Sequence, residues 1–475
     1  MDYNKIMEFL FNKFGFCYTN ADYYSKVTEW INWYKGDVPN FHKQVISNGI
    51  SMITEDIKKL KMAKRVSEDW TSAVLADGLE IVVNANKHTR TFVSGSKNNG
   101  GVLGSNNFTE MLSRTLEKMF ALGTCAIVAD LDGIVVDGGN YYLNEDTQIR
   151  LQFYDAHRII PLKYTNNNIT DVAFLSMCSN FGKTVYNLSV HIKEQDGYVI
   201  YNYTLDDKYC PVNNDKIVPV FRTMSKRPLF SIVRTNISNN VDLDSPMGVS
   251  VYSDSIDILK SIDQVYDACS RDVVTGQRLI LMNKKLLGQD EYGNLIAPQD
   301  AKRTYMTFFG DEVSPSGDTL DNFVKEFTPK LNCTELDTEL QNQLNILSNS
   351  VGLGTKFYNF DISTGVTATE YVGERNDFVR NSNKMKIAIV SAIKNIVQAI
   401  LHLGGILNKN VQVDAKIDIK INDSTVESDI EKRALDKEDV KDGIMSKVEY
   451  RVKYYGETED VATENLNKIP IDNQQ

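Results

Sequence analysis

Four segments of the chain carry apolar residues at intervals of three or four positions, which is the spacing of one face of a helix. They predict helices over residues 51–78, 246–276, 334–351 and 368–403. Asp244, Ser245 and Pro246 are typical helix-start residues and Gly276 is a typical helix-end residue, so they delimit the second helix. The apolar stripes are, in chain order, Ile53, Ile57, Leu60, Ala63, Val66 and Trp70; Tyr252, Ile256, Leu259, Ile262, Tyr266, Cys269 and Val273; Leu336, Leu340, Leu344, Leu347 and Val351; and Tyr371, Phe378, Met385, Ile389, Ile393, Ile396 and Ile400.

A different pattern fills residues 124–235, where short runs rich in β-formers are separated by turn residues. This pattern predicts an antiparallel meander. Further β-runs fall within 277–333, and "VQVDAKIDIKI" (411–421) alternates as one strand. Shorter helices are expected within 1–24, 28–35, 108–122 and the tail after residue 422. Together these elements predict an α+β fold with two to four structural regions.

Two capping boxes add helix starts to this pattern. Thr334-x-x-Asp337 precedes the third predicted helix, and Ser446-x-x-Glu449 lies in the tail. In each, the first side chain can accept a hydrogen bond from a backbone N–H of the first helical turn, and the acidic side chain can accept one from the backbone N–H of the first residue.

Trp30 and Trp33, three residues apart, are expected to pack in the core.

The composition is that of an ordinary folded chain with an acidic balance. Of 475 residues, 42% are hydrophobic and 24% charged, and 63 acidic against 52 basic residues give a formal net charge of −11. Proteins that coat nucleic acid by bulk charge show a basic excess, so this balance argues against that mode of binding. No transmembrane helix or secretory signal is predicted. The six cysteines form no C-x-x-C pair, which favours a reduced place of synthesis.

No active site can be identified from the sequence. The "FGKT" run at 181–184 lacks the glycine that a P-loop needs at position 177, and a strand pattern follows it, so a β-turn is expected. "GLG" at 352–354 lacks the third glycine of a dinucleotide fingerprint. The five histidines share no ligand spacing, and we predict no catalytic residue, metal site or cofactor. A metal-dependent nucleic-acid enzyme stays an open alternative, although no carboxylate pair points to one.

Several stretches, taken in order, resemble the portal proteins of tailed bacteriophages, of the type found in siphophages of Gram-positive hosts (the SPP1-like portal family). They are "WINWYKG" (30–36), "KMAKRVSEDWTSAVLADG" (61–78), "LDSPMGVSVYSDSIDILKSIDQVYD" (243–267), "GLGTKFYNFDISTGVTATE" (352–370) and the C-terminal "INDSTVESD" and "GIMSKVEYRVKYYGETEDVA". Their shared order and spacing over most of the chain carry the resemblance.

The resemblance implies a ring-forming α+β portal fold made of a wing, a two-helix stem, a small clip and a helical crown. On this chain the expected parts are 1–245 wing, 246–276 first stem helix, 277–333 clip, 334–351 second stem helix, 352–366 tunnel loop, 367–421 long wing helix and strand, and 422–475 crown.

The tunnel loop is expected to face the axial channel of the ring. Its candidate residues are Gly352, Gly354, Lys356, Phe357, Tyr358 and Gly365. The glycines give the backbone freedom to move. Lys356 offers a cation to a passing phosphate group, and the two rings offer surface contact. A loop–loop contact between neighbouring subunits is the alternative for Phe357 and Tyr358.

The implied function is that of a non-enzymatic ring, expected to hold twelve copies, at one capsid vertex. Double-stranded DNA would pass through it during packaging and ejection. The expected partners are further copies of the chain, the terminase large subunit, the major capsid protein, a head–tail adaptor and, if assembly needs one, a scaffolding protein, with no membrane. The ring would assemble in the bacterial cytoplasm and end in the virion. Another structural virion protein, such as a capsid or baseplate component, is the alternative from the same class.

Overall fold

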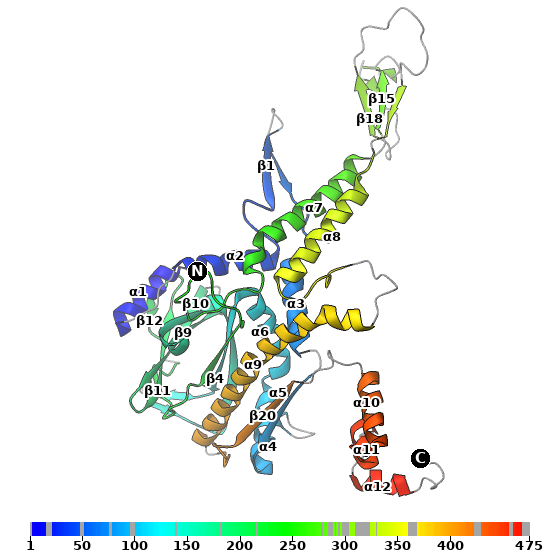
Figure 1. Ribbon diagram of the computed structural model, residues 1–475. Helices are drawn as coiled ribbons and strands as arrows, with labels where there is room; N and C mark the ends of the chain where they lie inside the picture. The colour runs from blue at the N-terminus through cyan, green and yellow to red at the C-terminus, as the bar shows by residue number, and fades with distance from the viewer. Residues whose placement is uncertain are drawn as a thin grey trace, which may run out of the picture.

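The computed structural model shows a body of helices and sheets from which a long two-helix hairpin projects (Figure 1). It describes the chain apart from residues 1, 16–20, 48–51, 76–77, 96–99, 138–139, 181–182, 215–216, 277–278, 284–287, 290, 293–294, 297–303, 309–323, 329, 360–367, 408, 422–428, 456–458 and 468–475.

Helices cover the N-terminal part, the projecting hairpin and the C-terminal part of the described chain. They are α1 (Tyr3–Phe14), α2 (Ala21–Lys35), α3 (Met62–Leu75), α4 (Lys87–Ser94), α5 (Gly101–Ser105), α6 (Phe108–Leu122), α7 (Ile256–Thr275), α8 (Cys333–Ser350), α9 (Ala368–Ile406), α10 (Asp429–Lys441), α11 (Lys447–Tyr455) and α12 (Glu459–Asn467), with 3-10 turns at Ala156–Arg158 and Ser253–Ser255. In Figure 1, α10 to α12 form a separate group near the C-terminus.

The strands form several small sheets rather than one large one. They are β1 (Lys43–Ser47), β2 (Met52–Asp56), β3 (Leu79–Asn84), β4 (Thr124–Asp132), β5 (Val135–Asp137), β6 (Asn140–Tyr142), β7 (Gln148–Asp155), β8 (Ile159–Thr165), β9 (Asn168–Asn180), β10 (Lys183–Glu194), β11 (Gly197–Leu205), β12 (Pro211–Val212), β13 (Val220–Arg222), β14 (Phe230–Arg234), β15 (Leu279–Asn283), β16 (Gly288–Gln289), β17 (Leu295–Ile296), β18 (Thr304–Phe308), β19 (Val324–Phe327) and β20 (Lys416–Ile421).

The antiparallel pairing predicted for residues 124–235 is confirmed, although only β8 to β12 follow one another as a meander. One sheet has the order β12-β11-β10-β9-β8, with β13 also paired to β11, and a second has the order β14-β4-β7. α1 covers part of the first sheet, because Ile6 and Leu10 form a separate buried cluster with strand residues such as Leu188. Most of the remaining buried apolar residues join the body into one core, which includes Trp30 and Trp33 as predicted.

α9 runs through this core and contacts β4, β14, β20 and α3. Among the described helices, residues 377–406 are long and apolar enough to cross a membrane by length and composition alone. Ile393, Ile396 and Ile400 are fully buried inside the protein, however. The apolar face of α9 is therefore a core face of the folded chain.

The helix predicted over 51–78 is wrong in its first third. Residues 52–56 form β2, which pairs with β1 in a two-stranded hairpin, and α3 begins only at Met62. The backbone between them is held by α7: Lys58 N–H donates to Asp267 Oδ1 at 2.9 Å, and Leu60 N–H donates to Asp263 Oδ1 at 2.8 Å. These tertiary bonds hold the two amides outside the helix that the local periodicity favours.

The start predicted for the second helix near residue 246 is also wrong, because α7 begins at Ile256. The Ser-Pro-x-Gly-x-Ser stretch forms two tight turns instead, with Met247 N–H on Ser245 Oγ and Tyr252 N–H on Ser250 Oγ. Serine side chains compete for backbone donors in this way and so favour turns over helices.

Gly248 lies within that stretch, at a close crossing of two backbone segments. A Cβ atom at Gly248 would lie 2.3 Å from the carbonyl oxygen of Gly123, the residue that ends α6. Gly248 N–H also donates to Thr124 Oγ1 at 2.9 Å. The crossing therefore requires glycine at position 248, which explains this part of the motif.

The two predicted capping boxes have different outcomes. α8 begins after Asn332, which makes no side-chain cap bond, so the box at Thr334 does not start this helix. The box at Ser446 is confirmed: Glu449 N–H donates to Ser446 Oγ at 3.1 Å, and Ser446 N–H donates to Glu449 Oε2 at 2.8 Å.

Candidate functional site

The projecting hairpin consists of α7 and α8, which pack side by side and carry a small sheet at their far end (Figure 1). In that sheet, β15 pairs in parallel with β18 and antiparallel with β19. The 20 residues of α7 make it about 30 Å long. The hairpin therefore holds the sheet far from the body.

Both ends of the hairpin are closed by polar contacts. At its base, Ser255 Oγ and Ser350 Oγ lie 2.7 Å apart. At its far end, Asn332 N–H donates to Asp272 Oδ2 at 2.7 Å, just before α8 begins. Near the base, the buried side chains of Leu259 and Ile262 on α7 and of Leu344 and Leu347 on α8 belong to one apolar cluster. An apolar seam between polar ends is the arrangement of a stiff antiparallel helix pair.

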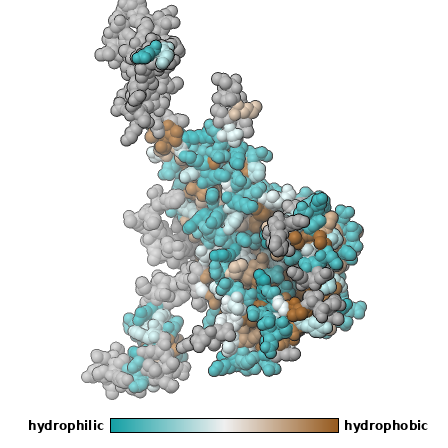
Figure 2. Space-filling view, turned by 180° about the vertical axis from the view of Figure 1, so that it is seen from behind, coloured by the Kyte–Doolittle hydropathy of each residue, from teal (hydrophilic) through white to brown (hydrophobic). Residues whose placement is uncertain are grey.

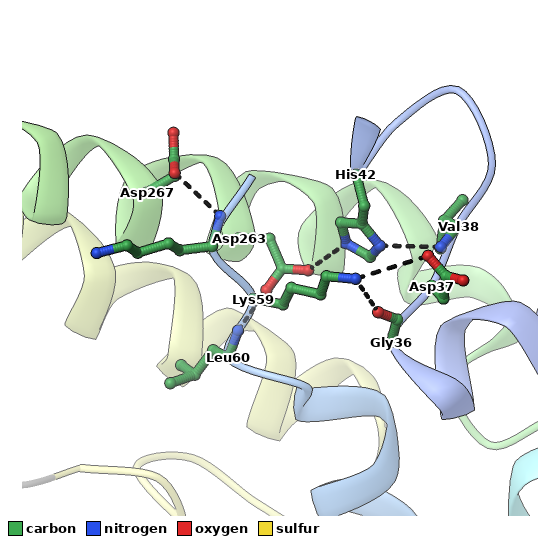
Figure 3. Close-up of polar contacts among 9 residues, drawn as sticks. Gly36, Asp37, Val38, His42, Lys59, Leu60, Asp263 and Asp267 are labelled. Carbon is green, nitrogen blue, oxygen red and sulfur yellow. Dashed lines mark hydrogen bonds and ion pairs between the residues drawn. The ribbon is translucent and has the colours of Figure 1, made fainter. Parts of the chain in front are cut away.

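A polar junction joins this hairpin to the body (Figure 3). Val38 N–H donates to His42 Nδ1 at 2.9 Å, so the ring carries its proton on Nε2. That nitrogen lies 3.0 Å from Asp263 Oδ2 on α7, and both side chains are buried. Lys59 Nζ donates to Gly36 O at 2.6 Å and closes the same junction from the side of the body.

The described half of the predicted tunnel loop is bonded to three helices. Trp70 Nε1–H on α3 donates to Val351 O at 3.1 Å, and Asn381 Nδ2 on α9 donates to Gly352 O at 3.0 Å. Gln341 Nε2 on α8 donates to Tyr358 O at 3.1 Å. Residues 352–359 are therefore anchored at both of their ends.

The predicted loop residues differ in their surroundings. Gly352 and Gly354 have φ angles of +79° and +93°, in the region that favours glycine. Lys356 and Phe357 are exposed, and the Phe357 ring also lies 5.8 Å from that of Phe378 on α9. Gly365 lies outside the described residues.

Tyr358 has a partner within its own chain. Its hydroxyl donates to Asp69 Oδ2 on α3 at 2.9 Å. Burial raises the pKa of Tyr358 far above its ordinary value, and the Asp69 charge adds to the effect. Burial also raises the pKa of the Asp69 carboxyl, although Tyr358 and Arg65 favour its charged form. The pair therefore carries its negative charge on Asp69 and its proton on Tyr358.

An apolar patch lies exposed where the hairpin meets its small sheet. Val273, Val274 and Leu331 are 55%, 59% and 43% exposed. In Figure 2, where most of the coloured surface is hydrophilic, a hydrophobic area lies at this end of the hairpin. Clustered apolar side chains of this kind mark contact surfaces.

Chemistry for catalysis is not evident in the described residues. Within them, no group of three or more His, Cys, Asp or Glu side chains is placed to hold a metal ion.

Lys183 of the "FGKT" run is the first residue of strand β10, so the strand predicted after this run is confirmed.

The polar junction was not predicted from the sequence. Its signal was Asp263 and Asp267, two carboxylates four residues apart that flank the apolar stripe of α7. Carboxylates at such a border usually face water; here both accept backbone N–H groups from another segment.

No curated protein matches the chain. A family model described as "Phage portal protein, SPP1 Gp6-like" matches residues 17–469, which is nearly the whole chain.

Proposed function

The chain belongs to the SPP1 Gp6-like family of phage portal proteins, and we propose that it assembles into a closed ring of identical subunits at one vertex of the capsid. The family is a structural one, and its members are virion proteins that serve DNA packaging. Twelve copies are expected in the ring. Double-stranded DNA passes along its axis, inward during packaging and outward during ejection.

The observation that carries this proposal is the α7–α8 hairpin with its small terminal sheet. Such a hairpin, repeated around an axis, makes a tube of helices with a rim of sheets. We assign 246–276 and 334–351 to the stem, 277–333 to the clip, 1–245 and 367–421 to the wing, and 422–475 to the crown.

Residues 352–366 are proposed as the loop that faces the channel. Lys356 is exposed within the described half, and it supplies the cation for transient phosphate contacts. The bonds of Val351, Gly352 and Tyr358 to neighbouring helices hold the base of this loop. DNA contact would then fall on exposed side chains such as Lys356 and leave these anchoring bonds in place.

The clip is proposed to dock the terminase large subunit during packaging and a head–tail adaptor afterwards. The major capsid protein surrounds the ring, and a scaffolding protein takes part if assembly needs one. Terminase supplies the energy of translocation. Assembly takes place in the host cytoplasm, and the portal itself needs no cofactor or enzymatic activity.

Electron microscopy of the purified protein in negative stain, combined with light scattering, tests the proposal. We expect rings with an axial hole and a mass of about twelve subunits. A closed ring needs two different, complementary faces on each subunit, so a stable monomer at micromolar concentration contradicts it. Solid particles without a hole would point instead to another virion component. ATP hydrolysis, or DNA cleavage with Mg²⁺ or Mn²⁺, by the protein alone would point to an enzyme.

A further inference from the structure

A groove of about 570 Å³ lies between the segment that follows β14 and the middle of α9. Arg234 forms part of one wall, and Ser391 and Asn395 of α9 form part of the other. None of the groove's described lining residues lies on α7 or α8, in the polar junction or at the loop base.

Arg234 brings an uncompensated positive charge to this groove. Its Nη1 donates to two backbone carbonyls, Asn167 O at 2.7 Å and Pro246 O at 2.6 Å. Within the described part of the chain, the other guanidinium N–H groups have no acceptor and no carboxylate pairs with the charge. Burial lowers the pKa of Arg234, but arginine stays charged in proteins.

The rest of the groove matches an anionic group rather than a cation. Its described lining contains no aspartate or glutamate. Ser391 and Asn395 bring a hydroxyl and an amide that can donate beside the guanidinium. An oxyanion placed here would pair with a partly desolvated cation, which is worth more than the same contact in water.

Exposed apolar side chains border the charged wall. Leu243 is 83% exposed and Ile237 is 39% exposed, and both line the groove. A phosphate backbone would leave these side chains in water. A protein segment with a carboxylate beside an apolar residue would cover both the cation and the rim.

We propose that the groove receives an aspartate or glutamate, together with an apolar neighbour, from a second copy of this chain. The proposal rests on the ring put forward above, in which a patch of one subunit meets a different patch of the next. Charge complementarity favours this occupant, because every copy carries 63 acidic against 52 basic residues. Arg234 would then anchor the contact, and Leu243 and Ile237 would seal it from water.

Site-specific photo-crosslinking of the assembled protein tests the contact directly. Leu243 is replaced by p-benzoylphenylalanine, with the same replacement at Met177, which is 58% exposed on β9, as the control. We expect covalent dimers from position 243, joined to a peptide in which an acidic residue adjoins an apolar one. Rings that give no dimer from position 243 overturn the inference but leave the ring proposal intact. Crosslinks to DNA or to another protein in particles overturn it as well.

A charge test provides the second measurement. Leu243→Glu puts an anion beside the groove without disturbing the core, and Met177→Glu is its control. We expect Leu243→Glu to raise the concentration for half-assembly at least tenfold, with an unchanged unfolding temperature. Arg234→Gln should raise this concentration by a similar factor and Arg234→Lys by a smaller one, although both substitutions loosen the two contacts with backbone carbonyls. Assembly of Leu243→Glu at the wild-type concentration overturns the inference; absence of any wild-type oligomer contradicts both proposals.

Discussion

His42 Nε2 donates a 3.0 Å hydrogen bond to Asp263 Oδ2, and this contact joins the segment before β1 to helix α7. Asp263 also accepts from Leu60 N–H through its other oxygen, and its neighbour Asp267 accepts from Lys58 N–H. Two carboxylates of one helix thus fix the backbone of a segment about 200 positions earlier in the chain. These bonds, together with the buried apolar residues of α7, hold the helix against the body.

His42→Ala should therefore lower the free energy of unfolding by about 2–3 kcal/mol, because it leaves a buried carboxylate short of a donor. Urea unfolding followed by circular dichroism measures the loss. His88→Ala is the control, since His88 is exposed on α4, and it should change stability by less than about 0.5 kcal/mol. Equal stabilities of the two variants would show that the junction contributes little.

Gly248→Ala should prevent folding or lower stability by more than about 3 kcal/mol. The added Cβ would meet the Gly123 carbonyl at 2.3 Å, and neither backbone segment can retreat without breaking the bond from Gly248 N–H to Thr124. Soluble yield and melting temperature are the measurements. Gly104→Ala is the matched control, because a Cβ there meets nothing within 4 Å. Normal folding of Gly248→Ala would refute the explanation of the Ser-Pro-x-Gly-x-Ser motif.

Acidification should destabilise the protein partly through His191. This side chain is buried between Phe174 and Phe230, and burial lowers its pKa to about 3. The unfolded state, with a pKa of about 6.5, binds the proton more readily. The contribution of neutral His191 to the free energy of unfolding is therefore fully present above about pH 6.5 and is lost as the pH falls toward 3. At pH 5 this loss is about 2 kcal/mol.

His191→Leu removes this titration. Its loss of stability between pH 7 and pH 5, measured by urea unfolding at each pH, should be smaller than that of the wild type. His157, whose pKa burial lowers to about 4, keeps part of the dependence in both proteins. His88→Leu serves as the exposed control. An identical pH dependence in wild type and His191→Leu would contradict the assignment.

Tyr358→Phe should loosen the base of the proposed channel loop. It removes the hydroxyl that donates to Asp69, a bond to a charged acceptor worth about 1–2 kcal/mol. Hydrogen–deuterium exchange should become faster at residues 352–359 and stay unchanged in α6. Tyr142→Phe, at an exposed tyrosine, is the control. Unchanged exchange at 352–359 would mean that the bonds from Trp70, Asn381 and Gln341 are sufficient to hold the loop.

Val274→Lys should weaken ring assembly at the apolar patch. A lysine near the C-terminus of α7 suits the helix dipole, so the variant should keep its unfolding temperature. We expect at least a tenfold rise in the concentration needed for half-assembly, measured by light scattering. Val135→Lys, at a partly exposed valine on β5, is the control. Normal assembly with lost adaptor binding would assign the patch to that partner instead.

The sequence predicts much of the fold because most of its elements depend on local patterns. The α9 stripe, the β4–β14 region and the helix ends at Lys35, Leu122 and Thr275 agree with their periodicity and glycine signals. The wrong predictions lie where contacts with residues far away in the sequence determine the local structure. Residues 52–60 follow a helical spacing, but the carboxylates of α7 and the pairing with β1 hold them extended.

The candidate site was less predictable for a related reason. Loop composition predicted backbone freedom at Gly352 and Gly354, and both residues have positive φ angles in the structure. It could not show that Tyr358 lies against Asp69, because the two residues are 289 positions apart. The groove at Arg234 could not be predicted from the sequence either, since its two walls come from the β14 region and from α9.

The two serines at the base of the hairpin have a wider consequence. Because Ser255 and Ser350 touch, the chain leaves the body and returns to it at one place, and everything between them is a single excursion. A graft cut at these serines would therefore transfer the α7–α8 hairpin and its small sheet, as one unit, from one family member to another. If the proposed docking at this end is right, such an exchange would change the partners of the ring and leave the rest of the subunit as it is.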